Sequence, residues 1–153
     1  MSVPFDMKVW DPDRLRMSFG GFRISRGAGA SGYASGDFAK LVQDKASFTE
    51  VEGTDGTVTR SKTYSRLTTF TLMTMQSNSL TNGFLSAQIF ADEVGINGAG
   101  ILPLSIQDLN GTTLFQALRA WVTKPADQDF SNEAKPREWI IKCIRDLTIV
   151  GGN

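Results

Sequence analysis

Turn-forming residues divide much of this sequence into short segments. Glycine and β-branched residues recur at short intervals over the first two thirds of the sequence. Strands joined by turns produce this pattern, so we predict a mainly β protein. Asp55-Gly56 and Asn110-Gly111 predict hairpin turns, because both dipeptides tolerate positive φ angles. The expected strands are 16–25, 37–43, 46–52, 57–62, 67–76, 101–108, 112–124 and 138–150.

One segment has a helical period instead. Its apolar residues recur at spacings of four and three, which predicts a single flanking helix over about residues 79–94. Ser77 or Ser79 can cap its first turn, and Gly95 can end it in the left-handed conformation. The residues expected on the packed stripe are Leu80, Phe84, Ala87, Ala91 and Val94.

The last predicted strand is interrupted by a charge. It alternates apolar and polar residues from Trp139 to Ile149, but Arg145 falls on the apolar side. Such an interruption indicates a strand end or a subunit boundary. Just before this strand, residues 125–137 form the longest expected loop.

Length and composition favour one folded domain. The chain has 153 residues and a mass of 16.7 kDa, and 41% of its residues are hydrophobic against 21% charged. These values fit one compact core and exclude a disordered chain. We expect a single domain over 1–153, with an N-terminal arm at 1–15 and a projecting hairpin at 50–66.

Charge and hydropathy argue against nucleic-acid and membrane binding. Sixteen basic and sixteen acidic residues give a formal net charge of zero, so no long-range field attracts a polyanion. The longest uncharged stretch, 67–91, is rich in Thr, Ser, Asn and Gln, so we do not expect it to insert in a membrane. The beginning of the sequence does not resemble a secretory signal.

The residue inventory offers little for catalysis. There is no histidine, and Cys143 is the only cysteine, which removes Ser-His and Cys-His nucleophiles and zinc sites with paired thiolates. Gly27, Gly29 and Gly32 match GxGxxG, but no helix-like segment follows, as dinucleotide binding would require. No residue spacing in the sequence supports an enzyme that uses a Ser-Lys pair or a pair of carboxylates. We expect no catalytic, cofactor or metal site.

Charges are segregated along the projecting hairpin. Three acidic residues precede three basic ones without mixing of sign. Either the two halves pair with each other across strands in a solvated hairpin, or the hairpin docks on a neighbouring copy of the chain. The residues are Glu50, Glu52, Asp55, Arg60, Lys62 and Arg66.

Four stretches of the sequence together are specific. They are GTDGTVTRSKTYSRLTTFTLMTMQSNS at 53–79, LPLSIQDLNGTTLFQALRAWVTKPADQDFS at 102–131, REWIIKC at 137–143, and the terminal GGN at 151–153. Through them, and over about residues 10–153, the sequence resembles the tail tube proteins of contractile-tailed bacteriophages, which are related in architecture to type VI secretion tube proteins.

The resemblance implies a β-sandwich or barrel-like subunit with one flanking helix, a ring-forming tail-tube fold. It implies hexameric rings that stack into a tube, the conduit for genome ejection inside a contractile sheath. The segment 50–66 matches the loop that reaches the adjacent ring. The implied partners are further copies of the chain, sheath, baseplate or initiator, tape-measure and tail terminator proteins, with DNA passing through the lumen. The implied location is the virion tail, after assembly in the host cytoplasm.

The main alternative is a monomeric β-sandwich that binds a ligand such as a carbohydrate. A solvent-facing aromatic platform would favour that alternative. Trp10, Trp121 and Trp139 are far apart in the sequence and suit core or interface positions better.

Overall fold

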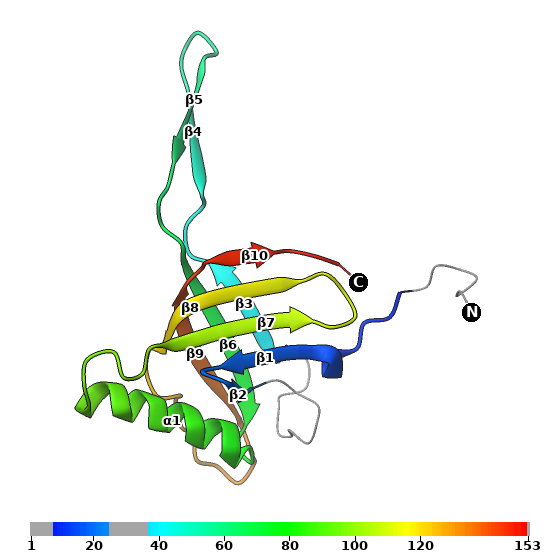
Figure 1. The fold of residues 1–153 in the computed structure, drawn as a ribbon, viewed down its shortest axis with the longest axis vertical. Helices are drawn as coiled ribbons and strands as arrows, with labels where there is room; N and C mark the ends of the chain where they lie inside the picture. The colour runs from blue at the N-terminus through cyan, green and yellow to red at the C-terminus, as the bar shows by residue number, and fades with distance from the viewer. Residues whose placement is uncertain (1–7, 25–36, 153) are drawn as a thin grey trace.

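A computed structural model describes residues 8–24 and 37–152 of the chain (Figure 1). Strands dominate it, and one long helix lies beside them. In chain order the elements are a 3-10 turn (Pro12–Arg14), β1 (Leu15–Phe19), β2 (Phe22–Arg23), β3 (Ala39–Gln43), β4 (Phe48–Glu52), β5 (Val58–Lys62), β6 (Leu67–Met75), α1 (Ser79–Val94), β7 (Leu102–Asp108), β8 (Leu114–Val122), β9 (Pro136–Ile144) and β10 (Leu147–Ile149).

The strands form one large antiparallel sheet and one separate hairpin. The sheet has eight strands in the order β2-β1-β7-β8-β9-β6-β3, and β10 pairs with β8 outside this path. The sheet folds over on itself into two layers, while β4 and β5 pair only with each other (Figure 1). The structure confirms the mainly β sandwich with one flanking helix.

Strand β8 joins the two layers. Its first half pairs with β10 at Leu114–Gln116, and its second half pairs with β9 from Arg119 to Val122. Its register with β7 advances from Leu104↔Ala117 to Leu102↔Ala120, which is three residues along β8 for two along β7. This extra residue is a β-bulge, and it bends the strand at the place where its partner changes.

The bulge also changes which side chains point inward. Phe115 and Ala117 are buried before it, and Ala120 and Val122 after it, so the alternation shifts by one residue. The backbone N–H of Leu118, at the bulge, donates to Oδ2 of Asp146 at 2.6 Å. Asp146 lies in the turn between β9 and β10. Its carboxylate therefore provides a partner for the N–H at the bulge and holds the turn through which the chain passes from β9 to β10.

The core fills the space between the layers and beneath the helix. In β6 every second residue is buried, as expected for a strand with one face toward the core. Fully burying one large apolar side chain stabilises the fold by about 1.5–3 kcal/mol relative to exposing it. The largest buried apolar side chains are Phe19, Phe70, Phe115, Met17, Ile24, Leu72, Leu85, Leu104 and Ile141.

Two predicted strands are each divided in the structure. The first is broken by a turn at Gly20 and Gly21, whose φ angles of 61° and 84° favour glycine. The last divides into β9 and β10 at the turn after Ile144, so Arg145 marks a strand end, as its position indicated. Strand β9 already begins at Pro136, so Arg137 belongs to a strand and not to the loop predicted to include it.

The bounds of α1 agree with the prediction, but its caps differ. The side chain of Asn78, not Ser77 or Ser79, accepts a hydrogen bond from the N–H of Thr81 at 3.2 Å. Gly95 has a φ of −94°, outside the left-handed region. The left-handed glycine is Gly98, with a φ of 87°, in the following turn.

The predicted packed stripe of α1 is also wrong. The buried side chains are Thr81, Leu85 and Ile89, whereas Leu80 is 75% exposed and Val94 is 65% exposed. The helix carries apolar residues on two opposite sides, so its period alone does not determine which side packs. Of the predicted stripe, the side chain with a described aromatic contact to the sheet is Phe84, whose ring stacks on Phe22 at a centroid distance of 4.2 Å.

This assignment of the packed side can be tested with two matched leucine substitutions. Leu85→Ala should lower the free energy of unfolding by about 2–5 kcal/mol, because it leaves a cavity under the helix. Leu80→Ala should change it by less than about 0.5 kcal/mol, because that side chain is mostly in solvent. Urea denaturation followed by circular dichroism measures both. Equal losses would contradict the observed orientation of α1.

Candidate assembly interface

The hairpin of β4 and β5 projects far beyond the sandwich along the long axis of the molecule (Figure 1). Every residue of both strands is exposed. The strands pair in register, with Glu50 opposite Arg60, and the turn closes through the N–H of Gly53 donating to the carbonyl of Thr57 at 2.7 Å. A two-stranded hairpin with no core of its own is marginally stable at best in water.

The register gathers the charges of the hairpin on one face. Directly opposed residues share a face, as do residues two apart on one strand. The charged face therefore carries Glu50 and Glu52 from β4 with Arg60 and Lys62 from β5. The opposite face has no charge and consists of Thr49, Val51, Thr59 and Ser61.

The opposed charges do not pair with each other. Within residues 8–24 and 37–152, the ion pairs are Lys124–Asp127 and Lys142–Asp44, and neither involves the hairpin strands. Instead, the guanidinium of Arg60 lies over the Phe48 ring, 4.4 Å from its centroid. The ammonium of Lys62 lies 5.6 Å from the ring centroid of Tyr64. Both carboxylates of β4 therefore remain available to a partner molecule.

The two remaining predicted residues lie elsewhere. Asp55 is in the turn, where its Oδ1 accepts the N–H of Thr57 at 3.0 Å. Hydrogen bonding from Thr57 lowers the pKa of the Asp55 carboxyl. Arg66 lies in the connection between β5 and β6, outside the paired strands, and its carbonyl accepts the N–H of Arg145 at 3.0 Å. The structure thus brings four of the six predicted residues together on one face.

A polar network anchors the base of the hairpin, and sequence analysis did not anticipate it. Nζ of Lys142 donates to Oδ2 of Asp44 at 2.8 Å and to the hydroxyl of Thr69 at 2.7 Å. Thr69 also donates to Oδ1 of Asp44. Asp44 follows β3 directly and precedes the hairpin, so this network ties the start of the hairpin to β6 and β9.

A second candidate interface is the free edge of β3. In the described part of the chain β3 pairs with β6 on one side only. The carbonyl of Phe38 accepts from the N–H of Met73 at 2.8 Å, and the N–H of Asp44 donates to Leu67 at 3.0 Å. Because ladder bonds alternate in antiparallel pairs, Leu41 and its odd-numbered neighbours direct their N–H and C=O groups away from the sheet.

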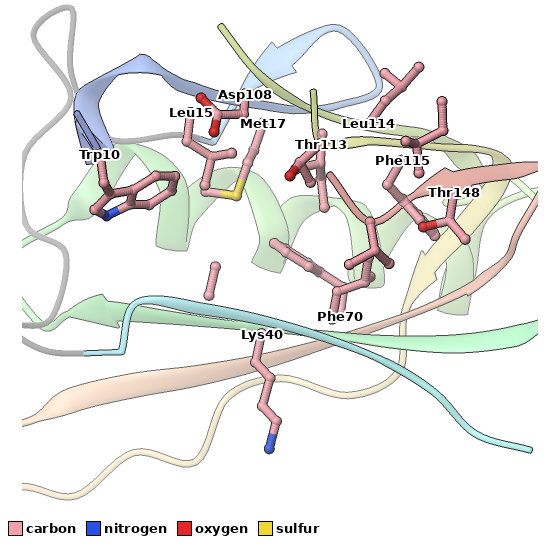
Figure 2. Close-up of a pocket in the computed structure, with 15 residues that line it drawn as sticks. Trp10, Leu15, Met17, Lys40, Phe70, Asp108, Thr113, Leu114, Phe115 and Thr148 are labelled. Carbon is pink, nitrogen blue, oxygen red and sulfur yellow. The ribbon is translucent and has the colours of Figure 1, made fainter. Parts of the chain in front are cut away.

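Next to this edge, a cavity of about 300 Å³ opens between the two layers (Figure 2). Met17 and Phe115 line one side and Phe70 the other, while the ammonium of Lys40 points away from the cavity (Figure 2). A smaller cavity of about 160 Å³ includes Leu41 from β3 and Thr148 from β10. The lining of the larger cavity is mostly apolar, and its polar members are Lys40, Asp108, Thr113 and Thr148.

The described residues contain no cluster of three or more His, Cys, Asp or Glu side chains that could hold a metal ion. Burial raises the pKa of the Cys143 thiol to about 11, so at neutral pH it is a protonated core residue, as its apolar position predicted. No helix within the described ranges has the length and apolarity needed to cross a membrane. The GxGxxG glycines Gly27, Gly29 and Gly32 lie outside the described residues.

Comparison with family models and with curated proteins finds no match to the chain. Solved structures do match. The cap that terminates the tube of the anti-feeding prophage is 14% identical, with a TM-score of 0.54, over 95% of this chain and 96% of that one. This chain therefore shares its fold with a tube-terminating cap.

Two further structures of this fold come from the extracellular contractile injection system PVC in its extended state. Its sheath/tube terminator is 18% identical, with a TM-score of 0.55, over 99% of this chain and 100% of that one. A chain of its sheath-tube complex is 17% identical, with a TM-score of 0.51, over 96% of this chain and 92% of that one. The shared fold therefore spans nearly the whole length of each protein.

The polar anchor at the base of the hairpin predicts a pH dependence. Hydrogen bonds from Lys142 and Thr69 lower the pKa of the Asp44 carboxyl below its ordinary value of 3.8. The ionised form is therefore favoured by folding, so its stabilisation is present at neutral pH and is lost as pH falls through the lowered pKa. Asp44→Asn should melt at a lower temperature than the parent at pH 7, and the difference should shrink below about pH 4. A difference independent of pH would contradict this assignment.

Proposed function

We propose that this chain is a structural subunit of a contractile tail or injection apparatus, and that it forms hexameric rings which stack into the inner tube. The observation that carries the proposal is the fold shared with tube-terminating and sheath-tube components over at least 95% of this chain. Neither the residue inventory nor the apolar cavities support a competing catalytic function in the described part of the chain.

Ring closure would use the free edge of β3. An exposed edge strand presents unpaired backbone groups, and pairing with another copy satisfies them. Leu41 is 36% exposed and Val42 is 45% exposed, so the same contact would bury apolar surface. The adjacent cavity would then be enclosed by the neighbouring subunit.

Stacking would use the projecting hairpin, whose exposed strands and unpaired carboxylates suit a contact with a subunit of the next ring. An exposed ion pair contributes about 0–1 kcal/mol, so charge mainly fixes register and polarity. The exposed side chains of Val51 and Val58 add apolar area to this contact.

In the assembled apparatus the proposed partners are a sheath outside the tube, a baseplate or initiator, a tape-measure protein and a terminator. DNA would pass through the lumen in a phage tail. A formal net charge of zero suits that passage, because cationic contacts release counterions and hold DNA in place. The proposed location is the tail of the particle, with assembly in the host cytoplasm and no membrane insertion by this subunit.

A second candidate is a terminator that caps the tube with a single ring. It is favoured by the two terminator structures, which include the match with the highest coverage of the three. A tube subunit elongates without limit once nucleated, whereas a terminator forms one ring and stops. The length distribution of assemblies from the purified chain separates the two.

The binding-module alternative has less support. Trp139 is buried and its Nε1 donates to Oδ1 of Asn82 at 2.8 Å, and Trp121 is only partly exposed. Trp10 is 57% exposed but stands beside the cavity between the layers (Figure 2). The three tryptophans therefore do not form a platform for a sugar.

The ring contact is tested at Leu41. Leu41→Pro removes an N–H that points away from β6, so the subunit should fold while ring formation falls at least tenfold, since proline blocks edge pairing. Leu41→Ala removes the side chain but keeps the N–H, and should retain most ring formation. Circular dichroism checks the fold and sedimentation measures ring content. Normal rings from the proline variant would exclude β3 as the ring edge.

The stacking contact is tested by reversing the basic residues. Replacing Arg60, Lys62 and Arg66 by Glu should leave the subunit folded but shorten tubes several-fold. Six copies of a pair worth about 0.5 kcal/mol give about 3 kcal/mol per ring junction if they add. Electron microscopy gives the tube lengths. Tubes as long as the parent's at physiological salt would show that the hairpin is only a solvated loop.

A further inference from the structure

Arg137 is a buried cation that forms no ion pair in the described part of the chain. Its side chain lies at the start of β9, and the residue is only 7% exposed. One guanidinium nitrogen donates a long hydrogen bond of 3.5 Å to the carbonyl of Asp129. Cζ of Arg137 lies 5.8 Å from the ring centroid of Phe130. Asp127 and Asp129 lie on the same loop, yet in the described ranges neither carboxylate forms an ion pair with it.

A charge that is largely removed from solvent is stabilised when an anion pairs with it. The guanidinium has five N–H donors, and one weak bond leaves most of them unused. Among the described residues, the one fully enclosed side-chain nitrogen or oxygen without a partner is Nδ2 of Asn78. The unused donors of Arg137 are therefore not sealed in, and they can be reached from outside.

The route to Arg137 is a crevice of about 230 Å³. Its wall combines Gln76, Asn82 and Ser86 with Gln128 from the loop before β9. The amides of Gln76 and Gln128 can donate further hydrogen bonds, and Trp139 closes one side. Arginine binds a carboxylate with two parallel N–H bonds, and neighbouring amide donors can add to them.

The crevice and the hairpin lie at opposite ends of the molecule. The hairpin forms one end of the long axis, and α1 with the loop before β9 forms the other (Figure 1). When copies stack head to tail, the tip of one hairpin therefore approaches the crevice of the next copy. A contact of this kind repeats along the stack without self-pairing within it.

Of the carboxylates on the hairpin, Glu52 is the one best placed to enter the crevice. It lies closest to the turn on β4, and its cross-strand partner is the apolar Val58. Glu50 faces Arg60 instead, and Asp55 is engaged by the N–H of Thr57. We propose that the carboxylate of Glu52 binds the guanidinium of Arg137 on the next copy of the chain, a contact that rests on the stacking proposed above.

The test is a double-mutant cycle on the critical concentration for assembly, measured by sedimentation. Glu52→Gln and Arg137→Met should each raise this concentration about tenfold, the effect of one charge-assisted hydrogen bond. The critical concentration of the double variant should agree with that of either single variant within about twofold, because the two substitutions remove the same contact.

Two matched controls make the cycle specific. Glu50→Gln removes a carboxylate from the same face, two cross-strand pairs further from the tip. Lys124→Met removes an exposed cation near the loop before β9. Glu50→Gln combined with Arg137→Met, and Lys124→Met combined with Glu52→Gln, should each give the product of the single effects. If the effects of Glu52→Gln and Arg137→Met on the critical concentration also multiply, or if either substitution has no effect, the contact between Glu52 and Arg137 is excluded. The stacking proposal is not affected by that result. A parent chain that never assembles would overturn both.

A second variant covers the case in which Arg137→Met does not fold. Arg137→Lys keeps the charge and supplies an amine that carbodiimide joins to a carboxylate in direct contact. Assembly from a mixture of isotopically light and heavy subunits then distinguishes links between copies from links within one. Mass spectrometry should find Lys at position 137 joined to Glu52 of another copy. Links only within one copy, or none in assembled material, would exclude the contact.

Discussion

The bulge in β8 allows one strand to serve both layers of the sandwich. Because β8 bends at Leu118, its first half pairs with β10 and its second half with β9. The carboxylate of Asp146 accepts the N–H of Leu118 at the place where the last two strands separate. This hydrogen bond is exposed, so without Asp146 the N–H of Leu118 would bond to water and the bend would lose its link to the turn before β10.

The same bend accounts for three features that the proposed assembly would use. Layers joined along one strand diverge at their far edges, and there β3 has no second partner in the described chain and apolar cavities open beside it. The hairpin continues from β3 and is held at its base by Lys142 and Asp44. Free edge, unfilled core and projecting hairpin thus follow from one topology, and all three suit a protein that completes itself with further copies.

Local pattern predicted much of the fold. Strand alternation, the Asp55-Gly56 turn and the bounds of α1 are properties of neighbouring residues, so the sequence was sufficient for them. The packed side of α1 was predicted wrongly because the helix is apolar on two sides, and only the position of the sheet selects Leu85 over Leu80. The bulge was missed, although the spacing of Phe115, Ala117, Ala120 and Val122 contains the shift in alternation.

The candidate interface was predictable only in part. The segregation of sign along the hairpin is visible in the sequence, but its confinement to one face and the lack of internal ion pairs depend on register. The link between Lys142 and Asp44 joins residues 98 positions apart, which no local pattern reveals. Arg137 was predicted to lie in a loop, but it lies in β9 and is buried. The loop before β9 contacts its side chain through Asp129 and Phe130.

Electron microscopy of the purified chain at high concentration tests whether it closes into rings through its own edges, as proposed. We expect end-on class averages with six-fold rotational symmetry, and side views of rings stacked head to tail. Dispersed monomers, persisting even when the other tail components are supplied, would contradict the proposal.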